Sequence, residues 1–284
     1  MSTILITGTS GFIGKALAIS LSKKHKIIGF SRKNPNIDGI ENLQGEFSNL
    51  EDLRKLNKFN INNVVHLAAV TGGCSERDGI LVNVEGTRQL MRYLIDRGCK
   101  KFVMASSIAA VGMQSIEFRP LQVPIADEHP CFDRDGYGFS KFLMEEVTKY
   151  YQRQNPDIDV INLRLAAICP DNNPAELVGI TPIKQWALGG LSMMMLSDAV
   201  KVFSLAVENP YKNGVRIMNA TAPLAWSNEP TADILRNWWG DDVDLFYYEN
   251  PTNKYASAYD TRMIIKELGF IAETTCKYLE KARK

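Results

Sequence analysis

A tyrosine and a lysine four residues apart are the side chains of this chain best suited to proton transfer. Tyr137 and Lys141 would share one face of a helix that we predict from Tyr137 to about Tyr151. A phenol titrates at roughly 10, too high for a base at neutral pH, but a neighbouring ammonium favours the phenolate. The pair could therefore act as an acid and a base. Exposed helical pairs share this spacing, so the position of Tyr137 and Lys141 in the fold must show whether the pair is catalytic.

A glycine-rich segment could bind phosphate. Residues 7–14, Thr-Gly-Thr-Ser-Gly-Phe-Ile-Gly, follow a predicted strand at Thr3–Ile6 and precede a predicted amphipathic helix. Gly8 permits the sharp exit from the strand, Gly11 lets the backbone approach a pyrophosphate, and Gly14 allows the helix to pack closely. The helix N-terminus adds free N–H groups and partial positive charge. This pattern predicts a dinucleotide-phosphate site.

Strands and helices alternate along the first part of the chain, which predicts a doubly wound parallel α/β sheet. Short apolar runs predict strands at residues 26–30, 64–69, 101–105 and 159–163, and the helices between them at residues 50–59 and 79–97. Residues 171–190 have a loop-like composition. Beyond them we predict helices at 197–208, 231–239 and 260–268, and strands at 215–218 and 243–246. We therefore expect a main domain at 1–170 and a small, interleaved substrate lobe at 171–284.

The glycine spacing, Gly-x-x-Gly-x-x-Gly, resembles that of the short-chain dehydrogenase/reductase superfamily, in its extended branch of sugar-nucleotide epimerases, dehydratases and reductases. Further motifs of this NAD-dependent epimerase/dehydratase family lie at Asn63–Ala69, Asn83–Thr87 and Asp127–Pro130. The resemblance is strong over about residues 1–170. It implies a Rossmann-type fold with a small C-terminal α/β lobe.

The same resemblance assigns catalytic roles. Ser106 and Ser107 follow a predicted strand, where ligands bind in such sheets. In the family, the catalytic Ser or Thr lies five residues before a glycine, which corresponds here to Ser107 before Gly112. Tyr137 would then exchange a proton with a sugar hydroxyl or carbonyl. Lys141 would hold the nicotinamide ribose and, together with an oxidised nicotinamide, lower the pKa of Tyr137. The family tyrosine that precedes the glycine is replaced by Val111.

The resemblance also predicts which residues bind the cofactor. These are the residues of the phosphate turn and helix start, the tip of the second strand, the adenine segment and the ribose loop, together with Tyr137 and Lys141: Gly8, Gly11, Phe12, Ile13, Gly14, Ser31, Arg32, Glu46, Phe47, Leu67, Ala68 and Ala69. A carboxylate at the second strand's tip would bind the NAD ribose, whereas an arginine accepts the 2′-phosphate of NADP. Because Ser31 and Arg32 stand there, we predict NADP, with NAD possible if Arg32 is only a solvated charge.

Other polar residues have simpler interpretations. We expect His66 to pack against the sheet and not to act as an acid or base, and Asn83 to have a structural or cofactor-side role. The family's diphosphate-binding arginine has no counterpart before Asp260. Lys184, Arg216 or Lys254 could replace it, although surface positions suit each of them better.

Three functions remain open. The first is an NAD(P)-dependent epimerase, reductase or dehydratase of a sugar or nucleotide sugar. The second, suggested by the reduced C-terminal region, is a dehydrogenase of a free sugar or uronic acid. The third is a non-catalytic NADP-binding regulatory protein, against which the presence of Ser107, Tyr137 and Lys141 argues.

Composition limits the partners. With 33 basic and 32 acidic residues in 284, the charge nearly cancels, so a small-molecule substrate is favoured over nucleic acid or a membrane surface. The five scattered cysteines predict neither a metal site nor disulfides and suit a cytoplasmic protein. The family resemblance implies a homodimer formed through the helices at about 79–97 and 137–151.

Overall fold

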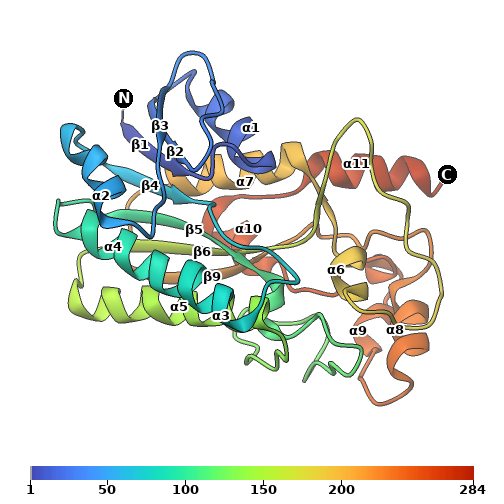
Figure 1. Ribbon diagram of the computed structural model, residues 1–284. Helices are drawn as coiled ribbons and strands as arrows, with labels where there is room; N and C mark the ends of the chain where they lie inside the picture. The colour runs from blue at the N-terminus through green and yellow to red at the C-terminus, as the bar shows by residue number, and fades with distance from the viewer. Residues whose placement is uncertain (1) are drawn as a thin grey trace.

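Seven parallel strands form the central sheet, and their parallel arrangement is the one that the sequence predicts. The computed structural model describes residues 2–284 and orders the strands β3-β2-β1-β4-β5-β6-β9 (Figure 1). Their bounds are β1 Thr3–Thr7, β2 Lys26–Ser31, β3 Glu41–Gln44, β4 Asn63–His66, β5 Lys101–Ser107, β6 Asp159–Leu165 and β9 Gly214–Ala220. The chain runs outward from β1 in both directions, so the strand order reverses between β1 and β4. In such sheets a crevice opens at this reversal, beyond the carboxyl ends of the strands.

Helices cover both faces of the sheet because its strands are apolar on both sides. Along β1, Ile4 and Ile6 face one core cluster and Leu5 faces another. The first cluster is completed by α1 (Phe12–Leu21), α7 (Leu196–Glu208) and α10 (Arg262–Leu268). The second is completed by α2 (Leu50–Leu53), α4 (Thr87–Ile95) and α5 (Gly136–Gln154). The doubly wound α/β fold is therefore confirmed.

A third core cluster lies beyond the carboxyl end of β5. It joins η3 (Ile108–Val111), α6 (Ala187–Leu191), α8 (Thr231–Trp239) and α9 (Phe246–Glu249). In Figure 1, α6, α8 and α9 gather at the end of the molecule opposite α2. The final helix, α11 (Glu273–Ala282), is joined to this region by the stacking of Tyr278 on Trp226.

The remaining elements are short. They are η1 (Arg54–Lys58), α3 (Glu76–Asp78), the π-helix η2 (Gly79–Gly86), η4 (Pro251–Asn253) and a small parallel pair of β7 (Ile168–Cys169) and β8 (Met194–Met195). Among residues 2–284, none of the helices combines the length and the apolarity needed to cross a bilayer.

Several sequence predictions differ from the structure. The strand predicted at 243–246 is wrong: Asp244 accepts a hydrogen bond from Phe246 N, and this turn leads into α9. The edge strand β3 was not predicted, because its sequence Glu-Asn-Leu-Gln is polar and partly exposed. The strand predicted at 64–69 ends at His66, and α6 lies inside the segment predicted as loop. Helix α11 was also not predicted.

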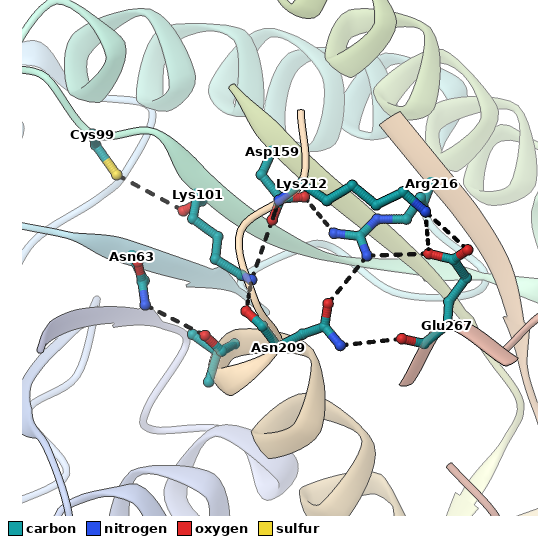
Figure 2. A network of polar contacts seen from close by, with 9 residues as sticks. Asn63, Cys99, Lys101, Asp159, Asn209, Lys212, Arg216 and Glu267 are labelled. Carbon is teal, nitrogen blue, oxygen red and sulfur yellow. Dashed lines mark hydrogen bonds and ion pairs between the residues drawn. The ribbon is translucent and has the colours of Figure 1, made fainter. Parts of the chain in front are cut away.

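A buried ionic cluster joins the amino ends of three strands (Figure 2). Asp159 of β6 contacts Lys101 of β5 at 3.2 Å and Arg216 of β9 at 2.5 Å, and all three side chains are buried. Glu267 at the end of α10 also pairs with Arg216. The surface position predicted for Arg216 is therefore wrong. Arg216 also lies at the amino ends of the strands, far from the crevice, so it cannot contact a ligand there.

We expect Asp159→Asn to destabilise the fold by about 3 kcal/mol, since it leaves Lys101 buried without a charged partner and Arg216 with Glu267 alone. The free energy of unfolding in urea measures this. Asp157→Asn is the matched control, because Asp157 forms an exposed pair with Lys100 and should leave stability unchanged. Equal stability of the two variants would contradict this role of the cluster.

Candidate active site

One cavity of about 410 Å³ lies at the carboxyl ends of β1, β4, β5 and β6. The structure brings together in its lining every residue predicted to bind the cofactor or to be catalytic: Gly8, Gly11, Phe12, Ile13, Gly14, Ser31, Arg32, Glu46, Phe47, Leu67, Ala68, Ala69, Ser107, Tyr137 and Lys141. Within residues 2–284, no cluster of three His, Cys, Asp or Glu side chains could hold a metal ion.

The glycine turn shapes one end of this cavity. Gly8 has a φ of +79°, which favours glycine, and a Cβ on Gly14 would lie 2.2 Å from the Gly8 carbonyl oxygen. Gly11 caps α1 without a side-chain hydrogen bond, and the first turn of α1 contains no acidic residue. The first N–H groups of α1 are therefore available to an anion. These features fit the diphosphate of a dinucleotide.

Thr7, which the sequence analysis did not single out, fixes the loop on the next strand. Its Oγ1 accepts hydrogen bonds from Leu67 N and Ala68 N, both at 3.1 Å. His66 hydrogen-bonds Thr7 at 2.7 Å and Thr87 at 3.0 Å, and burial lowers the pKa of His66 to about 3. His66 is thus a neutral structural residue, as predicted.

Asn83 joins the same loop to helix α5. Its Oδ1 accepts from Val70 N at 2.9 Å, and its Nδ2 donates to Val70 O and to Ser140 Oγ. Asn83 lies in the π-helix η2, where Gly79 packs against α5 so closely that a Cβ would lie 2.7 Å from the Gly136 carbonyl. The structural role expected of Asn83 is confirmed.

The far end of the cavity lies at the tip of β2. Ser31 is buried, and its hydroxyl donates to Lys33 O at 2.7 Å. Arg32 is exposed beside the cavity. Residues 31–34 contain no carboxylate, and Glu46 reaches the cavity from the segment after β3. This end of the cavity therefore carries the guanidinium of Arg32 and the carboxylate of Glu46.

Helix α5 delivers Tyr137 and Lys141 to the middle of the cavity. Asp135 caps the helix by accepting from Tyr137 N and Gly138 N. Ser107 is the last residue of β5, and its Oγ accepts a hydrogen bond from Ala109 N. The same hydroxyl acts on Tyr137 and favours a lower pKa of the phenol. Lys141 is 3% exposed, and its Nζ donates to the Ala105 carbonyl at 2.8 Å.

The burial of Tyr137 and Lys141 governs the protonation of both groups. Burial raises the pKa of Tyr137 to about 12, against the opposing hydrogen bond with Ser107. Lys141 alone does not lower it, because the ammonium lies 5.8 Å from the ring centre and bonds Ala105. Burial also lowers the pKa of Lys141 to about 8. At neutral pH the site thus holds a phenol and an ammonium.

Sequence analysis missed the other wall of the cavity, which Leu165, Ala166 and Ile168 form where β6 ends. The signal was their place directly after a predicted strand. The sequence also did not predict that Trp186 lies near Tyr137, with their ring centres 6.4 Å apart. Trp186 has a left-handed φ of 67°, and its ring packs so closely on Gly72 that a Cβ there would lie 2.6 Å away.

Sequence relatives share part of this chain. UDP-glucose 4-epimerase GEPI42 of Cyamopsis tetragonoloba is 28% identical over 57% of the chain and 50% of its own length. The chain spans about half the length of this relative and of the other curated epimerases that it matches first. The NAD-dependent glucose-6-phosphate dehydrogenase of Haloferax volcanii is 24% identical over 73% of the chain and 81% of its own length.

A solved structure shares the whole fold. A short-chain dehydrogenase/reductase superfamily protein from Agrobacterium tumefaciens, solved with bound NAD, superimposes with a TM-score of 0.71 at 22% identity, covering 99% of this chain and 96% of its own. The model of the NAD dependent epimerase/dehydratase family matches residues 4–179, which hold the glycine turn, Ser107, Tyr137 and Lys141. The chain belongs to the NAD dependent epimerase/dehydratase family.

Proposed function

We propose that this protein is an NAD(P)-dependent epimerase, reductase or dehydratase that acts by hydride transfer on a sugar or nucleotide sugar. One observation carries the proposal: Ser107, Tyr137 and Lys141 meet in the cavity that also contains the open N-terminus of α1. Membership of the family and the match to UDP-glucose 4-epimerases support it.

The residues present fit a nicotinamide dinucleotide. The first turn of α1 would hold its diphosphate, Leu67, Ala68 and Ala69 would face the nearer ribose, and Glu46 and Phe47 would line the adenine end. Leu165 and Ala166 also line the cavity. When bound, the nicotinamide would accept a hydride from the substrate or return one.

The chain's own residues would manage the proton. The Tyr137 hydroxyl would give a proton to a sugar carbonyl or take one from a sugar hydroxyl, and Ser107 would hydrogen-bond the same oxygen. The pKa of Lys141, at about 8, keeps an ammonium near this oxygen at neutral pH. Because burial holds the pKa of Tyr137 near 12, removal of its proton needs more positive charge than Lys141 supplies.

Tyr137→Phe should therefore reduce turnover by about 10²- to 10⁴-fold, because the ring remains but the transferable proton is lost. Nicotinamide affinity should be unchanged, since the diphosphate turn is untouched. Steady-state kinetics and calorimetric titration measure the two effects. Tyr211→Phe, at an exposed position outside the cavity lining, is the control and should behave as wild type. Retention of most activity in Tyr137→Phe would refute the assigned role.

We propose further that the cofactor is NADP(H). Arg32 is exposed beside the cavity, and residues 31–34 offer no carboxylate to bind the two ribose hydroxyls. A guanidinium can pair bidentately with a 2′-phosphate. NAD remains a candidate, because the similar Agrobacterium structure contains it.

Calorimetric titration with NADPH and NADH tests this preference. We expect tighter binding of NADPH, and we expect Arg32→Ala to weaken NADPH by about tenfold, the loss of a charge-assisted contact. NADH affinity in the same variant is the internal control and should not change. Tighter binding of NADH by the wild-type protein would contradict the NADP proposal.

A dehydrogenase of a free sugar or uronic acid is the second candidate, and the charges around the cavity favour it. Of the residues that line the cavity, only Arg32 and Lys141 are cationic, and Lys184 and Lys254 are exposed away from this lining. A nucleotide sugar would bring a second diphosphate that needs a cation. The ring of Trp186 beside Tyr137 suits the apolar face of a sugar ring.

Nicotinamide absorbance with UDP-glucose, glucose 6-phosphate and glucuronate separates the candidates. An epimerase leaves the cofactor unchanged over a cycle and converts UDP-glucose to UDP-galactose, which chromatography detects. A dehydrogenase reduces the cofactor continuously with a free sugar or uronic acid. Binding of cofactor without turnover of any sugar would instead support a regulatory protein.

Three further properties are part of the proposal. The cluster around α6, α8 and α9 supports a substrate lobe within residues 171–284 that is interleaved with the main domain at 1–170. Exposed Leu81, Phe139 and Tyr150 on the paired helices support a homodimer through residues 79–97 and 137–151. The five free cysteines support a cytoplasmic location.

A further inference from the structure

Two successive turns of α5 form hydrogen bonds with two successive residues at the end of β5. Lys141 Nζ donates to the Ala105 carbonyl at 2.8 Å, and one turn later Glu145 Oε1 accepts from Ser106 Oγ at 2.6 Å. The next residue, Ser107, is the candidate catalytic serine. Because residues four apart share one helical face, Lys141 and Glu145 both point at this strand end.

Glu145 is itself fixed by a buried ion pair. Arg164 of β6 donates to both carboxylate oxygens, from Nε at 2.9 Å and from Nη2 at 2.8 Å. Glu145 is 1% exposed and Arg164 is 5% exposed. The remaining Arg164 nitrogen, Nη1, donates to the Asp127 carbonyl at 2.8 Å. Glu145 therefore has one defined position, set by groups outside its own helix.

Glu145 also influences the pKa of Lys141. Burial lowers the pKa of Lys141, and the Glu145 carboxylate one turn away acts in the opposite direction. Titratable or charged groups face this pair from several elements. Beside Lys141 lie Tyr137 of α5, His66 of β4 and Cys74, which precedes α3. Beside Glu145 lie Arg164 of β6 and Cys131, which precedes α5.

We propose that Glu145 is a positioning residue, which holds Ser106 and hence places Ser107 beside Tyr137. This inference rests on the proposed function of Ser107, Tyr137 and Lys141. It adds a residue that lies outside the lining of the cavity and acts only through its neighbours.

Glu145→Gln tests the charge, because the amide keeps the shape but loses the ion pair with Arg164 that fixes its position on Ser106. We expect kcat to fall about 10- to 100-fold, with KM and nicotinamide affinity near wild type. The alkaline limit of the kcat profile should move about one pH unit lower, since Lys141 loses its neighbouring carboxylate. Glu146→Gln is the matched control: Glu146 is half-exposed, pairs with Lys149 and should leave both properties unchanged.

Ser106→Ala tests the anchor and keeps the ion pair of Glu145 with Arg164, so it should fold even if Glu145→Gln does not. It should lower kcat about tenfold without a shift in the pH profile. Wild-type kcat and pH profile in both variants would overturn the proposal. A loss of stability with unchanged kcat would overturn it as well, because Glu145 would then be structural only.

Hydrogen exchange gives a readout that needs no substrate. Peptides that cover residues 105–112 should exchange faster in Glu145→Gln and Ser106→Ala than in wild type and Glu146→Gln. If no sugar is turned over, the proposed function fails, while faster exchange would still support the anchoring by Glu145. Unchanged exchange in both variants would overturn the anchoring whether or not the protein is active.

Discussion

The packing of α5 against the carboxyl end of β5 is the contact on which the site depends. β5 is buried along its whole length, so its last residues cannot move without disturbing the centre of the sheet. Helix α5 hydrogen-bonds Ala105 and Ser106 of this strand end, and Ser107 follows them directly in the cavity lining. A helix and a strand far apart in sequence thereby hold a hydroxyl, a phenol and an ammonium within one cavity.

Strand β6 stabilises this arrangement from both of its ends. At its amino end Asp159 neutralises Lys101 and Arg216, and near its carboxyl end Arg164 neutralises Glu145. Buried charges of this kind are costly unless paired, so each pair fixes the register of neighbouring elements more than it adds stability. The two pairs have different consequences: the first concerns only the sheet, and the second reaches the candidate catalytic serine.

The sequence predicted the buried strands and the glycine turn, because each of these features depends on residues that are close together in the chain. Continuous apolar runs mark strands buried on both faces, and the glycine turn needs only residues 7–14 to be recognised. The cavity lining followed, because carboxyl ends of parallel strands meet at one edge. The polar edge strand β3 and helix α11 lack such patterns, and the alternation at 243–246 resembled a strand until Asp244 closed a turn.

Features that depend on distant partners could not be predicted. Arg216 resembles a surface residue until Asp159, 57 residues away, is placed beside it. Trp186 approaches Tyr137 only because its segment folds back over Gly72. The pKa of Tyr137 depends on burial that sequence spacing does not reveal.

The central claim is that the cavity beside Ser107 and Tyr137 binds a nicotinamide dinucleotide. A structure of crystals of the protein soaked with NADP⁺ tests this most directly. The account predicts the diphosphate on the N-terminus of α1 and the nicotinamide in the cavity beside Ser107 and Tyr137. A dinucleotide bound elsewhere, or a cavity that stays empty at saturating NADP⁺ and NAD⁺, would contradict it.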